Sequence, residues 1–408
     1  MRILHTADWH LGKRLHRHSL HRHQVQFIEW LLQTVEGQAV DAVLVAGDIF
    51  DTANPSSEAR NLYYSALARL HALGCQVIIT GGNHDSPSVL EAPRSLLKAL
   101  NIHVLGEKTA SPADMLTPVY DAAGTPAAMV STVPFLRDGD LRRLAGGETE
   151  SQREEAVRQG IARVFQEQAD EAHRHGQGVP QIAMGHLFVR GVSTSDSERD
   201  IQVGNQASVE DSVFSDIFDY VALGHIHKPQ RVGAQKRIFY SGSPIPLSFS
   251  EYQDQKRVML LEVNDDGLRT QSLPVPTYFR LPRMEGTLPQ IREKLQALVP
   301  EEEALIEISL KEPHYHPDLP VQLNELVDNH NQHHPRQPII HQRIEYGDKI
   351  TSTSELYGPE QDLNALTPQA VFRECLQQGA ISDENRELLE DAFQEILEEI
   401  RQDENLNI

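Results

Sequence analysis

The stretch "ITGGNHDSP" (residues 79–87) sets an amide, an imidazole and a carboxylate directly after a short apolar run and two glycines. Taken alone it is typical of a turn, because Gly, Asn83 and Asp85 tolerate positive φ and Pro87 helps to end a strand. The apolar run "CQVIIT" (75–80) that leads into it, however, is one of several short strands in this part of the chain. The stretch therefore has to be interpreted together with the other strand ends.

Short apolar runs alternate with helical patterns over the first hundred residues. The predicted strands are 2–6, 42–46, 75–80 and 102–105, and the predicted helices lie at about 22–36, 56–73 and 88–100. Strands separated by helices of this length indicate βαβ units. Later strands, at 181–186, 219–225, 237–243 and 257–263, have little helix between them. We therefore expect an α/β (α+β) fold in which a mixed sheet, or two facing mixed sheets, is flanked by helices.

Four segments are expected along the chain. A first domain covers residues 1–275 and ends at the proline-rich stretch "PVPTYFRLP". A small α+β capping module, residues 276–347, follows with two helices, near 287–299 and 320–331, and two strands, 304–310 and 338–345. Residues 348–365 are polar and contain Gly and Pro, as is typical of a linker. The tail, residues 366–408, is predicted to hold two helices, with Thr367 and Ser382 as N-caps.

Composition limits the class of protein. The chain has 408 residues, 39% of them hydrophobic, which suffices for a large core. No window approaches 18 apolar residues, so we expect neither a signal peptide nor a membrane-spanning helix. Cys75 and Cys375 are the only cysteines, which favours the cytoplasm and excludes a thiolate-built metal site.

Charge is unevenly distributed. The formal net charge of −22 argues against attraction of nucleic acid to the whole surface. Residues 13–23, "KRLHRHSLHRH", contain four Lys or Arg, four His and no acid. This stretch either meets a polyanion locally or forms a solvated loop that runs into a helix.

Polar clusters follow five of the predicted strands. In chain order they are "ADWH", "GDIFD", "GNHD", "MGH" and "LGHIH", which contain Asp8, His10, Asp48, Asp51, Asn83, His84, His186, His225 and His227. Ligands bind in the crevice outside the carboxyl ends of the strands in an open α/β sheet, so five separate segments can converge on one site. Each cluster alone is a weak signal, and their common position at strand ends is what indicates a site.

The spacing within these clusters favours two metal ions. Residues i and i+2 of an extended chain face the same way, so Asp8 with His10, and His225 with His227, can each present two donors to one centre. With Asp48, Asn83 and His186 they supply seven donors, too many for one tetrahedral ion. Oxygen and imidazole ligands are compatible with Mn, Fe, Zn or Mg, and Mn is favoured where carboxylate, amide and water ligands dominate.

The order D-x-H, GD-x-x-D, GNH(D/E), GH, GH-x-H resembles the calcineurin-like metallophosphoesterase superfamily. The longer strings "ILHTADWHLG", "VAGDIFD", "ALGHIHKPQ" and "YSGSPIPLSFSE" more narrowly resemble the SbcD family of nuclease subunits. The likeness covers residues 1 to about 275 and continues more loosely beyond. It implies two facing mixed sheets flanked by helices, the metallophosphoesterase fold, with a capping module and a helical tail.

The resemblance also implies a role for each residue of the site. One ion is held by Asp8, His10 and His227 and the second by Asn83, His186 and His225, with Asp48 bridging the two. His84 faces the phosphate and protonates the leaving oxygen or stabilises developing charge. Asp51 matches the position that orients this histidine in related phosphatases, although it is also a common turn residue. Asp85 is interpreted as a turn residue without a catalytic role.

The implied activity is that of a DNA nuclease, in which a metal-activated hydroxide attacks a phosphodiester. The resemblance implies exonuclease activity on double strands and endonuclease activity on single strands and hairpins, in double-strand break repair. Lys13 and Arg14, just after the first cluster, could neutralise DNA phosphates. Two alternatives are a phosphodiesterase for a small nucleotide substrate and a noncatalytic scaffold on the same fold. The scaffold is hard to reconcile with a complete ligand set.

A partner is expected to supply ATP hydrolysis. The sequence contains no G-x-x-x-x-G-K-[ST] loop, so no nucleotide cofactor is expected on this chain. The resemblance implies an SbcC-like ATPase with a coiled coil, a homodimer through the nuclease domain within a heterotetramer, and a nucleoid-associated place in the cytoplasm. The tail carries an apolar stripe with acids opposite, formed by Leu388, Leu389, Ala392, Phe393, Ile396, Leu397 and Ile400. Such a helix either docks in a groove of the partner or packs on its own domain.

Overall fold

The computed structural model describes residues 1–347 except 93, 122, 142–148, 176–177, 199–207, 234–236 and 265–266, together with six residues of the tail (372, 376, 389, 390, 392 and 393). Most of the predicted linker and tail, including the N-caps Thr367 and Ser382, lies outside the described residues. Among the tail residues within them, Phe393 of the predicted apolar stripe stacks on Phe372, with ring centroids 3.9 Å apart.

The first sheet has six strands in the order β14-β13-β1-β4-β5-β6. Four of them run parallel: β1 (Arg2–Ala7), β4 (Ala42–Ala46), β5 (Gln76–Thr80) and β6 (Ile102–Leu105). Strands β13 (Arg257–Asn264) and β14 (Gly267–Pro274) extend it in antiparallel fashion. Every residue of β4, "AVLVA", is buried, as expected for a central strand covered on both faces.

The second sheet also has six strands, in the order β11-β12-β10-β9-β8-β7. They are β7 (Leu116–Tyr120), β8 (Pro126–Thr132), β9 (Gln181–His186), β10 (Tyr220–Gly224), β11 (Gln230–Val232) and β12 (Ile238–Tyr240). Strands β8, β9, β10 and β12 are parallel, and β7 and β11 are antiparallel to their neighbours. The two sheets are therefore both mixed.

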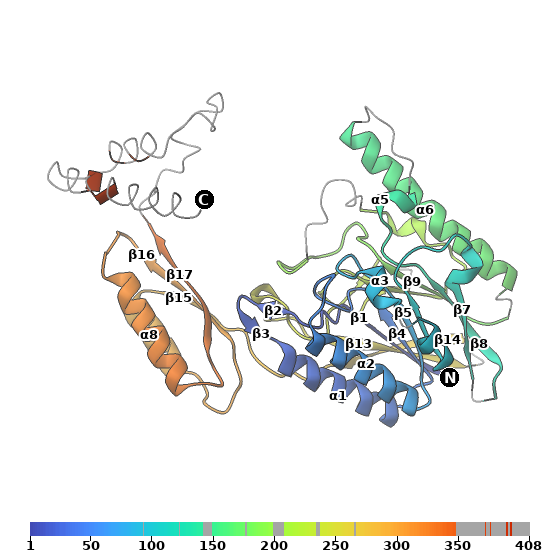
Figure 1. The fold of residues 1–408 in the computed structure, drawn as a ribbon, viewed down its shortest axis with the longest axis horizontal. Helices are drawn as coiled ribbons and strands as arrows, with labels where there is room; N and C mark the ends of the chain where they lie inside the picture. Colours follow the sequence, from blue (N-terminus) through green and yellow to red (C-terminus); the bar gives the residue numbers. More distant parts are fainter. Residues whose placement is uncertain are drawn as a thin grey trace, which may run out of the picture. The chain divides into compact units, whose positions relative to one another are not determined.

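The sheets face each other and helices cover their outer sides (Figure 1). Side chains of both sheets form one buried layer, in which Ile3 and Leu44 of the first meet Ile182 and Tyr220 of the second. Helices α1 (His21–Gly37) and α2 (Ser57–Ala72) pack on the first sheet, and α6 (Glu150–His175) packs on the second. The expected fold, two facing mixed sheets flanked by helices, is confirmed.

Several elements differ from the expectation. The helix expected at 88–100 is two short helices, α3 (Pro87–Leu90) and α4 (Arg94–Ala99). Strands β7, β8 and β14 and the 26-residue helix α6 were not predicted. The basic stretch runs into a helix as one alternative expected, since its last three residues begin α1, but the segment before the helix forms the hairpin β2 (Arg14–Leu15) and β3 (His18–Ser19). The remaining short elements are α5 (Asp138–Leu141), η1 (Pro112–Met115), η2 (Asp211–Val213) and η3 (Phe249–Glu251).

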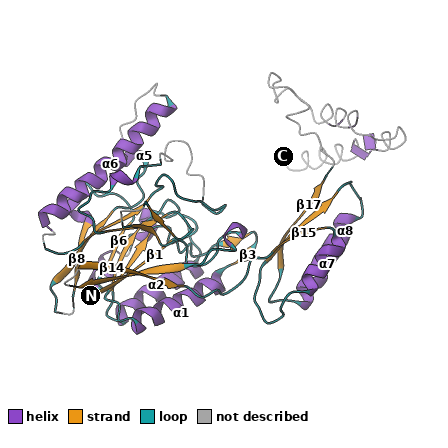
Figure 2. Cartoon of the chain, turned by 180° about the vertical axis from the view of Figure 1, so that it is seen from behind, coloured by secondary structure: helices purple, strands orange, loops and turns teal. Residues whose placement is uncertain are grey.

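The module is a three-stranded sheet with two helices on one face (Figure 2). Its elements are β15 (Arg283–Gly286), α7 (Leu288–Gln296), β16 (Ile306–Glu312), α8 (Leu319–His333) and β17 (Ile339–Tyr346). Helix α7 begins at a capping box between Thr287 and Gln290. The apolar faces of α7 and α8 are buried through residues such as Ile291 and Leu323. Only β15 is absent from the predicted elements of this module.

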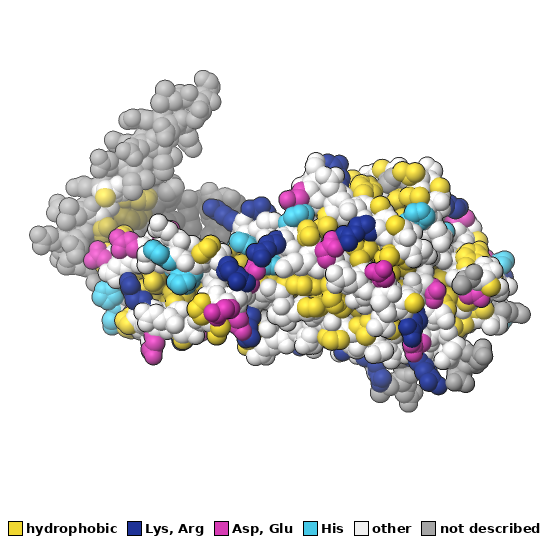
Figure 3. All heavy atoms as spheres, turned by 90° about the horizontal axis from the view of Figure 1, so that it is seen from below, with side chains coloured by type: hydrophobic (Ala, Val, Ile, Leu, Met, Phe, Trp, Pro, Cys, Tyr) yellow, Lys and Arg dark blue, Asp and Glu magenta, His cyan; other side chains and the backbone are white. Residues whose placement is uncertain are grey.

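Contacts divide the chain into two compact units, residues 1–310 with 318–344, and residues 311–317 with 345–408. The first domain and most of the module therefore belong to one unit. Arg22 of α1 pairs with Glu303 at 3.2 Å, and the His16 ring stacks on that of His341. No helix in the described part of the chain is long and apolar enough to cross a membrane. On the face shown in Figure 3, basic and acidic side chains are interspersed.

Candidate metal centre

The carboxyl ends of five strands bring the predicted ligands together. Asp8 and His10 follow β1, Asp48 follows β4, and Asn83 follows β5. On the second sheet His186 is the last residue of β9, and His225 and His227 follow β10. Asn83 is half-buried, whereas the other six side chains belong to residues that are at most 5% exposed. All seven thus lie at the shared edge of the two facing sheets.

The Asp48 carboxylate lies between two groups of donors. Its Oδ2 is 3.5 Å from His10 Nε2 and 3.4 Å from His186 Nε2. His10 Nε2 in turn lies 3.1 Å from His227 Nε2. On the other side, His186 Nε2 lies 2.9 Å from Asn83 Oδ1. Two sets of three ligating groups, His10 with Asp48 and His84, and Asp8 with Asp48 and His186, each come within 4.8 Å of one another and share Asp48.

Asp8 and His225 connect the two sheets at this edge. The main-chain N–H of His225 donates to Asp8 Oδ1 at 2.9 Å, and Asp8 Oδ1 lies 3.7 Å from His186 Nδ1. The His225 ring lies edge-on to that of His186, with centroids 5.3 Å apart. The GH-x-H strand end is therefore joined to the D-x-H strand end through Asp8.

Several of the predicted metal ligands have strained backbone angles, and glycines allow the segments that carry the ligands to approach one another closely. Four of the seven residues have a positive φ: Asp8 (51°), His10 (43°), Asp48 (39°) and His225 (98°). Non-glycine residues rarely adopt such angles, which persist where the surrounding structure fixes them and which cluster at functional sites. A Cβ at Gly82 would lie 2.1 Å from Asp48 Oδ1, and one at Gly224 would lie 1.6 Å from the Ala46 carbonyl oxygen. Glycine is thus required where the loops approach the carboxylate and where the two sheets meet.

The donor set fits divalent cations. Burying two carboxylates among four imidazoles is costly unless the charges are compensated. Burial opposes the ionisation of Asp48, yet His186, His10 and His84 hold the pKa of its carboxyl well below its usual range. Burial raises the pKa of Asp8 to about 8 and lowers the pKa of His225 to about 3. Divalent cations bound by these oxygens and nitrogens would compensate the buried carboxylates.

His84 lies against Asp48 within this cluster. Its main-chain N–H donates to Asp48 Oδ1 at 2.9 Å, and its Nε2 lies 3.9 Å from Asp48 Oδ2. Its Nδ1 lies 2.7 Å from the main-chain oxygen of Asp51. The Asp51 carboxylate lies 3.3 Å from His10 Nδ1 and 3.1 Å from Lys13 Nζ. The expected contact between positions 51 and 84 thus involves the backbone of Asp51, while its side chain lies against a predicted metal ligand.

The two predicted DNA-contacting cations differ in their surroundings. Lys13 is partly buried and paired with Asp51 beside the cluster. Arg14 is exposed at the start of β2, where its guanidinium donates to the Arg17 carbonyl oxygen within the hairpin. Lys13 therefore lies closer to the predicted chemistry than Arg14 does.

Asp85 has a structural role that sequence reasoning missed. It is buried, and its carboxylate accepts hydrogen bonds from the main-chain N–H groups of Ile49, Phe50 and Gly82 at 2.9 to 3.0 Å. These bonds join the loop after β4 to the loop after β5. Asp85 is thus more than a turn residue, because it sets the distance between the segments that carry Asp48 and Asn83.

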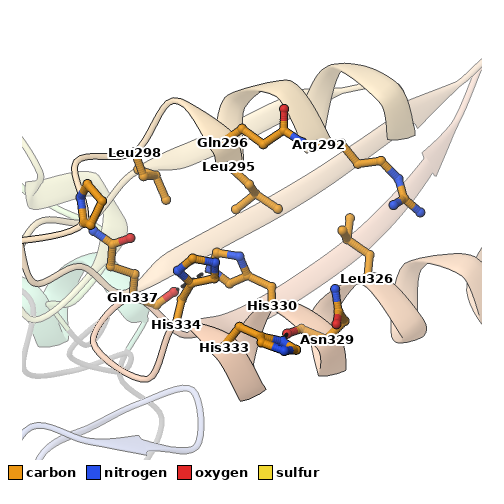
Figure 4. Close-up of a pocket in the computed structure, with 11 residues that line it drawn as sticks. Arg292, Leu295, Gln296, Leu298, Leu326, Asn329, His330, His333, His334 and Gln337 are labelled. Atoms are coloured by element: carbon orange, nitrogen blue, oxygen red, sulfur yellow. Dashed lines mark hydrogen bonds between the residues drawn. The ribbon is translucent and has the colours of Figure 1, made fainter.

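Two other features, a cluster of ligating side chains and a hollow, lie apart from this centre. His16, Glu307 and His341 offer three ligating atoms, but the two imidazoles are stacked with planes 4° apart, so their lone pairs lie in parallel planes and do not converge on one ion. A hollow of about 570 Å³ opens between α7 and α8, where Arg292, His330 and His334 are among its lining residues (Figure 4). It contains none of the predicted site residues.

Comparison with known proteins places these features in a family. Residues 1–229 match the calcineurin-like phosphoesterase family, and residues 278–379 match the family described as type 5 capsule protein repressor C-terminal domain. The SbcD subunit of nuclease SbcCD from Escherichia coli is 38% identical over 299 residues, which cover 72% of this chain and 74% of the relative. The chain belongs to the SbcD family of calcineurin-like phosphoesterases.

Two further relatives support membership of the same family. Proteins of the same name from Rhodobacter capsulatus and Bacillus subtilis are 40% and 34% identical, over 73% and 64% of this chain and 75% and 66% of the relatives. The predicted superfamily is confirmed by the first match. Membership identifies the chain as a metal-dependent phosphodiesterase, a hydrolase that works with divalent metal ions.

Proposed function

We propose that this chain is a DNA nuclease subunit that cleaves phosphodiesters with two divalent metal ions. It acts as an exonuclease on double strands and as an endonuclease on single strands and hairpins in double-strand break repair. The observation that carries the proposal is the position of Asp48, whose carboxylate is shared by donors from both sheets. The relatives' name, which includes the word nuclease, supports a nucleic acid as the substrate.

Each predicted ligand receives a role in this proposal. Asp8, His10 and His227 would hold one ion, Asn83, His186 and His225 would hold the other, and Asp48 would be shared between them. When bound, the ions supply Lewis-acid catalysis, because they neutralise charge on the phosphate and activate water at neutral pH. Mn²⁺ suits this set of carboxylate, amide and imidazole donors, and Mg²⁺, Fe²⁺ and Zn²⁺ are the other candidates.

His84 is the proton donor in the proposed reaction. A carbonyl oxygen can only accept, so the Asp51 main-chain oxygen requires a proton on His84 Nδ1. The proton that passes to the leaving oxygen is then the one on Nε2 of the imidazolium, which points toward Asp48. The Asp51 carboxylate acts on the reaction indirectly, because it fixes the His10 ring through Nδ1.

DNA and an ATPase are the proposed partners. Lys13 and Arg14 lie in the segment between Asp8 and α1, where they can neutralise phosphates close to the ions. The module of residues 276–347 would contribute further contacts with DNA, and the tail of residues 366–408 would dock on an SbcC-like ATPase with a coiled coil. The relatives are named as subunits of a complex. The assembly would be a heterotetramer built on a nuclease homodimer and associated with the nucleoid.

A phosphodiesterase for a small nucleotide is the second candidate. The same metal centre would serve that reaction. The module makes it the weaker candidate, because a small substrate needs neither the three-stranded sheet with α7 and α8 nor an amphipathic tail.

The substrate test compares DNA with a small ester. The full chain is incubated with Mn²⁺ and either a hairpin DNA, supercoiled DNA or a generic phosphodiester ester, with and without the ATPase partner. An Asp48→Ala chain purified in the same way controls for contaminating nucleases. We expect DNA cleavage that the ATPase and ATP stimulate and that the control lacks. Hydrolysis of the ester alone, with intact DNA under every metal, would favour the second candidate.

A further inference from the structure

A buried ion pair lies directly behind the proposed metal ligand His227. Glu251 at the end of η3 is 0% exposed, and Lys256, just before β13, is 4% exposed. Lys256 Nζ donates to Glu251 Oε2 at 2.5 Å. Neither residue belongs to the proposed ligand set. A fully buried ion pair is weak support for stability, because desolvation offsets its attraction, so its position next to the metal centre calls for another explanation.

Lys256 and Glu251 both have further hydrogen-bond partners. Lys256 Nζ also donates to the main-chain oxygen of His227 and to Ser243 Oγ, both at 3.0 Å. Five further groups lie within hydrogen-bond distance of the Glu251 carboxylate, which are the hydroxyls of Ser195, Ser197, Ser243 and Ser248 and the main-chain N–H of Leu247. Because Lys256 balances its charge and polar groups surround it, the carboxylate is a fixed hydrogen-bond acceptor.

The Ser197 hydroxyl links the Glu251 carboxylate to the imidazole of His227. Its hydroxyl lies 2.5 Å from Glu251 Oε1 and 2.5 Å from His227 Nδ1. A hydroxyl has one proton, and the carboxylate can only accept, so Ser197 donates to Glu251. Its oxygen must then accept from His227, which places a proton on Nδ1 and leaves the lone pair on Nε2. That is the nitrogen 3.1 Å from His10 Nε2, on the side of the proposed ion.

The backbone of His227 is held from the same side. Its main-chain N–H donates to Glu198 Oε1 at 2.8 Å, and its carbonyl oxygen accepts from Lys256. The ring and both main-chain polar atoms are therefore fixed by residues on two segments, 195–198 and 251–256. Partners of this kind orient a metal-bound imidazole and select its tautomer.

We propose that Ser197, Glu251 and Lys256 are positioning residues that hold His227 with its Nε2 lone pair directed at one of the two metal ions. The inference rests on the proposed function, since it requires His227 to be a ligand. It gives a role to an ion pair in this buried place and to the serine hydroxyls around its carboxylate.

Ser197→Ala tests the inference most cleanly, because the segment has other anchors. The main-chain N–H of Asp196 still donates to Ser250 Oγ, and Glu198 still accepts from His227. The full-length chain is freed of metal and titrated with Mn²⁺ by calorimetry. We expect one of two binding events to weaken by about 10- to 100-fold while the other is unchanged. Ser197→Thr keeps the hydroxyl and should restore the affinity.

Ser193→Ala is the matched control, since Ser193 is exposed on the same segment and contacts Gln230 through its backbone. It should bind both ions like the wild type. Glu251→Gln is the second variant. A glutamine amide can donate to Ser197, which would turn the hydroxyl toward His227 Nδ1 and force the proton onto Nε2, so the same ion should bind more weakly.

Different results would contradict the proposed function and the positioning role of Ser197. A wild-type chain that binds fewer than two ions contradicts the proposed function itself. A wild-type chain that binds two ions, together with a Ser197→Ala chain that binds both with unchanged affinity, overturns the positioning role alone. A Ser193→Ala chain as impaired as Ser197→Ala would also overturn it, because the loss would then follow from the segment and not from the hydroxyl.

Discussion

Asp48 is the residue around which the site is built, and its position could be predicted only in part. The "GD" signal after an apolar run placed it at a strand end, and the other strand ends predicted that it has neighbours. The positive φ of Asp48 and the close contact with Gly82 are set by tertiary structure, and nothing in the local sequence indicates them. The same holds for Asp51, whose spacing from Asp48 predicted its location but not which of its oxygens would meet His84.

Ser197 and Glu251 show what residue-level reasoning missed. Glu251 stands in the string "YSGSPIPLSFSE", which carried part of the resemblance, yet no pattern in it predicts contact with residue 197 or 227. An acid among serines is typical of an exposed loop. Its burial follows only from the fold, which brings η3 against the loop after β10.

His84→Gln and Asp48→Ala separate catalysis from metal binding. Glutamine cannot deliver a proton as imidazolium does, so we expect Mn content near that of the wild type and a DNA cleavage rate lower by about 10²- to 10⁴-fold. Asp48→Ala should lose metal, because the shared carboxylate is gone. Metal content is measured by elemental analysis and cleavage on a hairpin substrate. His103→Gln, on β6, is the control and should change neither. Equal metal loss in His84→Gln and Asp48→Ala would mean that His84 is misassigned.

His5 predicts a pH dependence of stability. It is fully buried on β1, its Nδ1 lies 2.9 Å from the Tyr220 hydroxyl, and burial lowers its pKa to about 3. Between pH 6.5 and about 3 the unfolded chain binds a proton at this histidine and the folded chain does not. The free energy of unfolding therefore falls as the pH falls, by up to about 1.4 kcal/mol per unit from this one group.

The measurement is the free energy of unfolding in urea at pH 7, 6 and 5, for the wild type and for His5→Gln. The variant should be less stable at pH 7, because it disturbs the contact with Tyr220, but its stability should depend less steeply on pH. Parallel curves for the two proteins would contradict the assignment.

At the scale of elements, short apolar runs were enough to predict β1, β4, β5, β9 and β10, which carry the site. Strand β8, "PAAMVST", was missed because it begins with proline and its buried residues run consecutively, so it lacks the alternation that marks a half-buried strand. Helix α6 does carry a helical signal, with Val157, Ile161 and Phe165 buried at fourfold spacing. It packs on the outer face of the second sheet and contributes no predicted ligand.

Gly224→Ala tests how closely β10 approaches β4. Its new Cβ would lie 1.6 Å from the Ala46 carbonyl oxygen, and main chain cannot move aside as a flexible side chain can. We expect the free energy of unfolding to fall by about 3 kcal/mol or more, the upper end for overpacked sites. Gly37→Ala, at the end of α1, meets no atom within 4 Å and should be neutral or slightly stabilising. Similar stability for both variants, measured by urea unfolding, would be inconsistent with this packing.

At the scale of the whole molecule, the net charge of −22 is compatible with DNA binding only if contact is local. The sequence predicted where acidic and basic residues gather along the chain, but not which of them neutralise one another. Lys13 pairs with Asp51, and Arg22 pairs with Glu303 of the module. Both cations are thus partly neutralised within the chain, which a count of charges along the sequence does not reveal.

Ile396→Asp tests the role of the tail. A charge in the apolar stripe should abolish retention of the ATPase by the tagged chain in a pull-down, while two Mn ions per chain still bind. Glu398→Gln, on the acidic side of the helix, is the matched control and should retain the partner. Undiminished retention by Ile396→Asp, accompanied by lower thermal stability, would indicate instead that the tail helix packs on its own domain.

The central claim, that five strand ends enclose a pair of divalent cations, is tested most directly by anomalous diffraction from crystals of the chain soaked with Mn²⁺. We predict two anomalous peaks about 3.5 to 4 Å apart on either side of the Asp48 carboxylate, one next to His10 and His227 and the other next to Asn83 and His186. A single peak, or peaks remote from Asp48, would contradict the account.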